Sequence, residues 1–279
     1  MIAATLKRID KARVYKMNKA QKTLLEIVQN FISNKNNSID GNILNDIEYL
    51  SDIHACTTFV YKGLAKMNLT IPDSIEKKTI ASIVMNYKNL SVQDEVIRIL
   101  HKNGIKCAIL KGSSVATYYP DSIYRILGDI DVLVDVQNYY RAIKLLTGDN
   151  DCDMKKENHK FHYGFIRHGI SIEIHKYVTE YPNDKFGDAL ESYMSNALDD
   201  VDYESYEGFK FPVLDIERQS VALLLHTKRH FVNNKLTLRM LCDWSVFIRM
   251  VCDVGKFEAV LHRLSLLGLD KFFNLINEV

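Results

Sequence analysis

The sequence predicts an α+β fold in which a small mixed β-sheet core is flanked by N-terminal and C-terminal helical regions. Apolar residues recur at helical spacing between about residues 17 and 103, and again after Pro212. Between these stretches, from Gly104 onward, short β-rich runs alternate with helical ones. We therefore divide the chain into an N-terminal helical region (1–103), an α/β core (104–214) and a C-terminal helical region (215–279).

The N-terminal region is predicted to contain three helices. Two sets of apolar residues keep the spacing of a helix face, namely Leu24, Ile27, Val28 and Phe31, and Ile43, Ile47 and Leu50. The polar residues 34–42 and the stretch 69–74, which contains Pro72, separate the helices. The last helix is expected to cover residues 76–102.

The core is predicted to contain strands at residues 105–110, 129–135, 161–167 and 170–178, and helices at 113–119 and 138–146. His168-Gly169 is typical of a two-residue turn, so the last two strands are expected to pair antiparallel.

The C-terminal region is predicted to contain three helices. Asp215 is expected to cap the first, which runs to about His230, because its carboxylate can accept hydrogen bonds from first-turn N–H groups. Two further helices are expected at about 236–251 and 257–276, after Asn233-Asn234 and Gly255.

The composition describes a globular protein without a strongly charged surface. Its 279 residues are 47% hydrophobic, which is enough to fill a core. Lys and Arg number 36 against 35 Asp and Glu, so the net charge of +1 gives no field that would attract nucleic acid or a membrane. The five cysteines are widely spaced without a Cys-x-x-Cys pair, which indicates reduced thiols of a cytoplasmic protein.

The start of the sequence carries no secretory signal. Met1 to Leu6 runs directly into the basic residues Lys7, Arg8, Lys11 and Arg13. Asp10 and the absence of serine before residue 33 favour a solvated helix face over a transit peptide. The longest apolar run, Val221 to Leu225, is far shorter than the roughly 18 residues of a membrane span. A cytoplasmic protein with no membrane contact is expected.

Two acids lie side by side in the segment Gly128-Asp-Ile-Asp-Val-Leu-Val. On a strand, the apolar residues face inward, and Asp129 and Asp131 share the other face with Cα atoms about 6 to 7 Å apart. Hard cations such as Mg²⁺ prefer oxygen ligands, so this pair is a candidate metal site. The alternative is that Asp129 belongs to a turn and Asp131 is an exposed strand residue.

A third acid follows in Ser171-Ile-Glu-Ile-His. Strand alternation places Glu173 and His175 on one face and the two isoleucines on the other. Three acids from two strands can converge on one or two metal ions, as two-metal nucleotidyl transfer requires. The alternative is an edge-strand acid paired with Lys176 or Arg167.

The segment Leu110-Lys-Gly-Ser-Ser joins a buried strand to a short helix. Gly112 permits close approach of a ligand to the backbone, and Ser113 adds a donor at the helix start, so phosphate can bind there. Lys111 and Arg125 are candidates for the triphosphate charge. The alternatives are a simple helix cap at the turn and ion pairs with acids for the two cations.

The C-terminal helices carry two pairs at a spacing of four. His226 and His230 share a helix face, and their spacing without an intervening Glu favours packing or substrate contact over zinc. Arg239 and Asp243 are expected to form an ion pair within one helix.

These segments occur in the order Leu110-Lys-Gly-Ser, Arg125-x-x-Gly-Asp-Ile-Asp-Val-Leu-Val, Ile172-Glu-Ile-His, His226-x-x-x-His and Leu238-Arg-x-x-x-Asp-Trp. In this order, across roughly residues 100–250, the sequence resembles the uncharacterised nucleotidyltransferase family of the DNA polymerase β superfamily.

The resemblance implies a nucleotidyltransferase core that binds a nucleoside triphosphate with one or two Mg²⁺ ions. It matches Gly112 and Ser113 to the family's Gly-Ser turn, Asp129 and Asp131 to its metal pair, and Glu173 to its third acid. The sequence departs from the superfamily in two ways. Ser113 lies 16 residues before Asp129, a longer interval than in compact members, and the third acid is Glu rather than Asp.

The leading hypothesis is transfer of a nucleoside monophosphate to an acceptor hydroxyl. Asp129 and Asp131 would bind magnesium, and Glu173 would complete the site or act as a base. Lys111, Ser113 and Arg125 would hold the triphosphate, with substrate contacts from His175, His226 and His230. The near-neutral charge favours a small molecule or a protein over RNA as acceptor. The alternatives are a catalytically silent nucleotide-binding or scaffolding protein and the toxin of a toxin–antitoxin pair.

Overall fold

The structure is a computed structural model, and it describes residues 17–33, 44–148, 152–158 and 161–278. The basic residues before position 17, the polar stretch 34–42 and Ile43 lie outside these ranges, so their predicted roles stay untested. Within the described residues, no helix is both long and apolar enough to cross a membrane.

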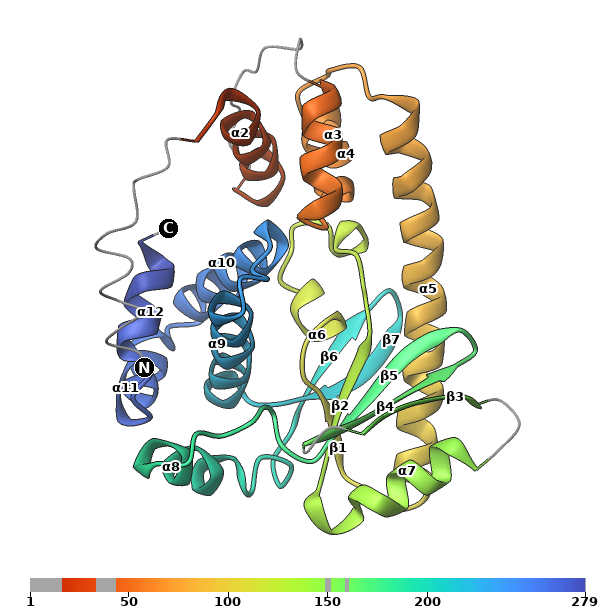
Figure 1. Ribbon diagram of the computed structural model, residues 1–279, viewed down its shortest axis with the longest axis vertical. Coiled ribbons are helices and arrows are strands. Elements are labelled where there is room, and N and C mark those ends of the chain that lie inside the picture. Colours follow the sequence, from red (N-terminus) through yellow and green to blue (C-terminus); the bar gives the residue numbers. More distant parts are fainter. Residues whose placement is uncertain (1–16, 34–43, 149–151, 159–160, 279) are drawn as a thin grey trace.

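The N-terminal part of the described chain folds into four helices. They are α2 (Lys19–Ser33), α3 (Leu44–Ile53), α4 (Thr57–Lys66) and α5 (Asp73–Lys102). The predicted apolar face of α2 is buried as expected. The prediction of three helices was wrong because the chain turns at Ala55, which adopts φ 53° without the glycine or proline that usually marks a break. Figure 1 shows α2–α4 at one end of the molecule and α5 running from them along the sheet.

The sheet has seven strands in the order β3-β4-β5-β2-β1-β7-β6. Their bounds are β1 (Cys107–Ile109), β2 (Ile130–Val134), β3 (Cys152–Asn158), β4 (His162–Arg167), β5 (Ile170–His175), β6 (Asp202–Tyr206) and β7 (Phe209–Val213). The β2–β5 and β1–β7 pairs are parallel and the other pairs antiparallel. The predicted α+β fold with a mixed sheet is confirmed, although the sheet is larger than the four strands expected.

Three strands and one helix escaped the sequence reading. The strands are β3, β6 and β7, and the helix is α8 (Lys185–Met194). β6 reads Asp-Tyr-Glu-Ser-Tyr and lies at the sheet edge, so it lacks the apolar alternation of a half-buried strand. β7 contains Pro212, which argues against a strand in a sequence reading.

Two-residue turns set the register of the β4–β5 and β6–β7 hairpins. His168 and Gly169 have φ values of 52° and 74°, and Glu207 and Gly208 have 50° and 83°. Positive φ at both central residues is the geometry of a type I′ turn, whose twist matches that of the flanking strands. The predicted antiparallel pairing across His168-Gly169 is confirmed, with Arg167 opposite Ile170.

The C-terminal part contains α9 (Ile216–Val232), α10 (Leu238–Asp253), α11 (Phe257–Leu266) and α12 (Asp270–Asn277). Asp215 caps α9 as predicted, since its Oδ1 accepts a hydrogen bond from the Arg218 N–H at 3.0 Å. The single helix expected at 257–276 is two helices, because Gly268 adopts φ 67° between them.

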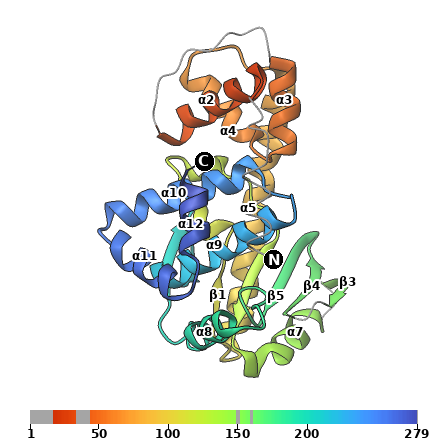
Figure 2. The same ribbon diagram turned by 60° about the vertical axis from the view of Figure 1, so that its left-hand side comes forward.

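Each face of the sheet packs into its own apolar cluster. On one face, α5 and α7 (Tyr139–Thr147) cover the sheet, and on the other lie α6 (Ser113–Ala116), α8 and the C-terminal helices. The second cluster also takes in α2–α4, beyond the end of the sheet (Figure 2). Short 3-10 turns at Ser122–Tyr124 and Val136–Asn138 complete the described elements. The division at residues 103 and 214 stays a prediction.

Candidate active site

Three carboxylates converge at the centre of the sheet. β2 and β5 are parallel neighbours, and their register places Asp131 directly opposite Glu173. Asp129 immediately precedes β2, and one oxygen from each of the three residues lies within 4.8 Å of the others. The alternation predicted for both strands is confirmed, because Ile130 and Ile172 pack into the cluster on the opposite face. The acids therefore share one face.

The three acids span a gradient from the interior to solvent. Asp131 is only 2% exposed, Glu173 is intermediate and Asp129 is exposed. The alternative of an exposed Asp131 is thus wrong. The alternative partners of Glu173 are also engaged elsewhere, since Arg167 pairs with Glu95 at 2.6 Å and Lys176 lies over the rings of Tyr139 and Tyr177. A cation entering from solvent meets Asp129 first.

Lys111 extends from the end of β1 into this carboxylate cluster. Its Nζ lies 2.9 Å from Oδ1 of Asp131. Burial lowers the pKa of Lys111, but the negative charges of Asp131, Asp129 and Glu173 outweigh burial and the net shift is upward. The lysine is therefore charged and supplies positive charge where a triphosphate or a metal ion would bind.

His175 bridges two of the carboxylates. Its Nε2 lies 3.0 Å from Oδ1 of Asp131 and 3.1 Å from Oε2 of Glu173. Burial lowers the pKa of the imidazole, yet the hydrogen bonds to both carboxylates outweigh this and raise it. For Glu173, burial raises the pKa, but the contacts with His175 prevail and lower it to about 2. His175, predicted as a substrate contact, is placed against the acids themselves.

The Gly-Ser turn lies beside Asp129. Gly112 adopts φ 68°, a conformation that L residues with a side chain rarely take, and a Cβ there would lie 3.8 Å from the Asp129 carbonyl oxygen. Ser113 is buried, and its hydroxyl donates to Oε1 of Gln93 on α5 at 2.6 Å. Among the described residues, the backbone N–H groups of residues 112–114 have no protein acceptor. The turn therefore offers main-chain N–H donors to a ligand, whereas the Ser113 hydroxyl is already engaged with Gln93.

Arg125 is placed away from the carboxylate cluster, in a buried ion pair. Its Nε and Nη2 donate to the two oxygens of Asp243 at 3.1 and 2.7 Å, and both side chains are almost fully buried. The hydroxyl of Tyr119 donates to the same carboxylate at 2.7 Å. The predicted contact of Arg125 with a triphosphate is therefore not retained, because its guanidinium is already engaged.

Arg239 differs from its prediction for the same reason. Asp243 forms its ion pair with Arg125, so the expected pair within α10 is absent among the described residues. Arg239 instead donates from Nη1 to the Ile126 carbonyl at 3.2 Å, and its Nε has no hydrogen-bond partner within the described part of the chain. Burial and the charge of Arg125 lower its pKa, while the charge of Asp129 acts in the opposite direction. Arg239 is thus a partly exposed cation near the carboxylates.

His226 and His230 stack on one face of α9, with ring centroids 4.5 Å apart. Burial lowers the pKa of both imidazoles, and the charge of Lys111 lowers it further. Both are therefore neutral at neutral pH. Among the described residues, neither belongs to a group of three or more side chains that could hold a metal ion.

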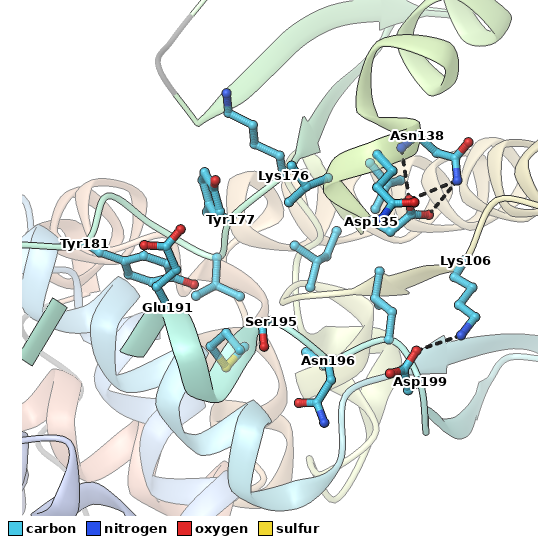
Figure 3. Close-up of a pocket in the computed structure, with 18 of the residues that line it drawn as sticks. Lys106, Asp135, Asn138, Lys176, Tyr177, Tyr181, Glu191, Ser195, Asn196 and Asp199 are labelled. Atoms are coloured by element: carbon cyan, nitrogen blue, oxygen red, sulfur yellow. Dashed lines mark hydrogen bonds and ion pairs between the residues drawn. The ribbon is translucent and has the colours of Figure 1, made fainter. Parts of the chain in front are cut away.

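A cavity of about 600 Å³ begins beyond the acids, on the same side of the sheet. Leu133, two residues after Asp131 on β2, contributes to its wall. Figure 3 shows Tyr177, Tyr181 and Glu191 grouped on one side and the Lys106–Asp199 ion pair on the other. The cavity is therefore a neighbour of the carboxylate cluster rather than its centre.

Sequence reasoning missed one side chain in this region. His162 on β4 lies directly opposite His175 on β5, and its Nε2 is 3.8 Å from Oε1 of Glu173. The signal was present in the hairpin, because a two-residue turn at His168-Gly169 fixes which residues face each other.

Known proteins resemble this chain in sequence and in fold. A family described as uncharacterised nucleotidyltransferase matches residues 45–278. A proposed nucleotidyltransferase from Thermotoga maritima superposes with a TM-score of 0.35 and 16% identity, over 53% of this chain and 94% of its own. An antigenic nucleotidyltransferase-like protein from Paracoccidioides brasiliensis gives 0.40 and 14%, over 63% and 87%. No curated protein matches the sequence significantly.

Proposed function

The chain belongs to the uncharacterised nucleotidyltransferase family, and from this premise we propose that it transfers a nucleoside monophosphate from a magnesium-bound nucleoside triphosphate to an acceptor hydroxyl. One observation carries the proposal: Asp129, Asp131 and Glu173 place carboxylate oxygens within 4.8 Å of one another, beside the Gly112 turn. Nucleotidyl transfer needs such a cluster of acids next to a place for the triphosphate.

The donor set fits a hard divalent cation. Carboxylate oxygens are the ligands that Mg²⁺ prefers, and the three acids on one face outnumber their two cationic partners, Lys111 and His175. Bound magnesium would stabilise the charge that develops on the phosphates and lower the pKa of the attacking hydroxyl. We propose Asp129, Asp131 and Glu173 as its ligands.

The triphosphate is held by groups around the Gly112 turn. The turn lets phosphate approach the main chain, where the free N–H groups of residues 112–114 donate. Lys111 and Arg239 supply positive charge, and we assign to Arg239 the triphosphate contact that the sequence predicts for Arg125. His226 and His230, being neutral, suit contacts with uncharged parts of the substrate.

In the reaction, the acceptor oxygen forms a bond to the α-phosphorus while the bond to the β-phosphate breaks. Pyrophosphate leaves and the hydroxyl proton passes to solvent. A carboxyl whose pKa is about 2 is a weak base, so Glu173 suits the role of ligand better than that of general base.

We infer that the acceptor is a small molecule. The cavity of about 600 Å³ beyond Leu133 has the size of a small-molecule site, and it lies along the same strands as the acids. The net charge of +1 gives no basic surface for tracking an RNA backbone. Tyr177 and Glu191 offer an aromatic ring and a carboxylate for recognition.

The test uses the protein with magnesium, each of the four nucleoside triphosphates labelled on the α-phosphate, and a low-molecular-weight cell extract. We expect a labelled small product and released pyrophosphate, both lost in Asp131→Asn. Binding of nucleotide without release would favour the catalytically silent alternative. Absence of both binding and release would overturn the proposal. Growth arrest on expression, lost in Asp129→Ala, would instead support the toxin alternative.

A further inference from the structure

A second set of metal-binding donors lies against the carboxylate cluster. His162 on β4 and His175 on β5 are directly opposed in the antiparallel ladder, so both side chains emerge on the same face of the sheet. Their ring centroids are 5.0 Å apart. Glu173, two residues before His175, emerges on that face as well. Two imidazoles and one carboxylate thus come from a single hairpin.

The donor atoms of these three residues converge. Nε2 of His175 lies 3.1 Å from Oε2 of Glu173, and Nε2 of His162 lies 3.8 Å from Oε1 of the same carboxylate. One ligand atom of each residue lies within 4.8 Å of the other two. Ligand atoms around a tetrahedral zinc ion are about 3.3 Å apart, because each is about 2.0 to 2.1 Å from the metal. The separations of up to 4.8 Å exceed this spacing by about 1.5 Å, which rotations of the side chains can close.

The chemistry of this set differs from that of the three acids. Imidazole nitrogens bind zinc, cobalt and related transition metals, whereas magnesium and calcium prefer oxygen. Both histidines are 3% exposed, while Glu173 is open enough to face a second ion. Two histidines and one glutamate supply three of the four ligands of a tetrahedral site, and Oδ1 of Asp131 lies beside them, 3.0 Å from Nε2 of His175.

We propose that His162, Glu173 and His175 hold a divalent transition-metal ion, and that Glu173 bridges this ion to the cation of Asp129 and Asp131. Glu173 belongs to both sets of donors, since its carboxylate oxygens lie within 4.8 Å of donor atoms of Asp129 and Asp131 and of the two histidines. Such a centre would combine one oxygen-ligated ion with one histidine-ligated ion. The bridging role of Glu173 rests on the proposed function, whereas metal binding by His162, Glu173 and His175 can be tested without it.

The experiment measures metal binding by protein without a histidine tag. Stripped protein is dialysed against Zn²⁺, and bound metal is counted by mass spectrometry. Co²⁺ then reports the ligand type through its visible absorption spectrum. We compare wild type with His162→Ala, with Asp129→Asn, and with His262→Ala, in which an exposed histidine on α11 is removed as the matched control. His162→Gln and circular dichroism check that the fold survives.

We expect wild type and His262→Ala to bind one zinc ion tightly, and His162→Ala to bind it about 100-fold more weakly, since one of three protein ligands is gone. Magnesium affinity should be unchanged in His162→Ala and reduced in Asp129→Asn. Equal zinc binding by folded His162→Ala and wild type, or no zinc bound by wild type, would overturn the proposal. Either result leaves the transferase test unaffected, because that test uses magnesium and nucleotide.

Discussion

Two clusters of charged side chains lie within this molecule, and they differ in how completely their charges are matched. Around Asp243, one carboxylate receives two hydrogen bonds from Arg125 and one from Tyr119, and all three side chains are buried. In the carboxylate cluster, three acids share Lys111 and His175, and the set extends from the interior to solvent.

This difference indicates that the cluster around Asp243 is structural and that the carboxylate cluster is suited to bind a ligand. A buried carboxylate with several good donors is satisfied and holds its neighbours in place. Here it ties α10 to the segment that leads into Asp129. Acids packed together with fewer cations repel one another, so they favour a positively charged ligand.

The largest effect is expected when the buried ion pair between Arg125 and Asp243 is broken. Asp243→Ala should lower the free energy of unfolding by about 3 to 5 kcal/mol, because it leaves the buried Arg125 charge without its partner. Urea denaturation followed by circular dichroism measures this loss. The double variant Arg125→Met with Asp243→Leu should recover most of it, since both charges are removed. A loss below about 1 kcal/mol in Asp243→Ala would show that the ion pair is not the structural anchor.

In the carboxylate cluster, a substitution is expected to reduce activity strongly and stability only slightly. Asp131→Asn should slow nucleotidyl transfer at least about 100-fold, equivalent to about 2.7 kcal/mol, because it removes the central buried carboxylate. Its free energy of unfolding without metal should change by less than about 1 kcal/mol, since repulsion among the acids falls as the contact with Lys111 is lost. Pyrophosphate release and urea denaturation are the two measurements. A severely destabilised Asp131→Asn protein would contradict the contrast between the clusters.

Lowering the pH should reduce the free energy of unfolding through protonation of Glu173. Its folded-state pKa of about 2 lies below the ordinary value of 4.5, so the folded state binds this proton more weakly than the unfolded state does. Its contribution is therefore fully present above about pH 4.5 and is lost as pH falls toward 2, on the order of 2 kcal/mol in total. Urea denaturation from pH 6 to 3 in chelator compares wild type with Glu173→Gln. The stability difference should shrink as pH falls; a difference that grows would contradict the assignment.

The smallest expected effect distinguishes the roles of Arg239 and Arg125 in nucleotide binding. Arg239→Gln should weaken nucleoside triphosphate binding about tenfold, or about 1.4 kcal/mol, because it removes a partly exposed cation near Asp129. The conservative Arg125→Lys should leave affinity nearly unchanged and lower stability, since lysine cannot repeat the two-pronged contact with Asp243. Calorimetry with magnesium and nucleotide provides the affinities. Equal affinity of Arg239→Gln and wild type would exclude Arg239 from the triphosphate contact.

Local patterns in the sequence were enough to place the acids. Alternation along β2 and β5 put Asp131 and Glu173 on one face, and the His168-Gly169 turn defined the hairpin that carries Glu173 and His175. Patterns failed where burial was atypical: the polar edge strand β6 and the Pro-containing β7 were missed. The turn at Ala55 was missed because no residue there marks a break.

By itself, the sequence determined the local elements and the identity of the acidic cluster, because alternation, turn chemistry and helix caps act over a few residues. Only the tertiary structure decided which charges meet. Arg125 and Asp243 are 118 residues apart, and Ser113 meets Gln93 of a different helix. Such pairs form when packing brings distant elements together, and no local pattern encodes that. The same packing brings Lys111 to Asp131 and leaves Arg239 near Asp129, with no ion pair to a carboxylate among the described residues.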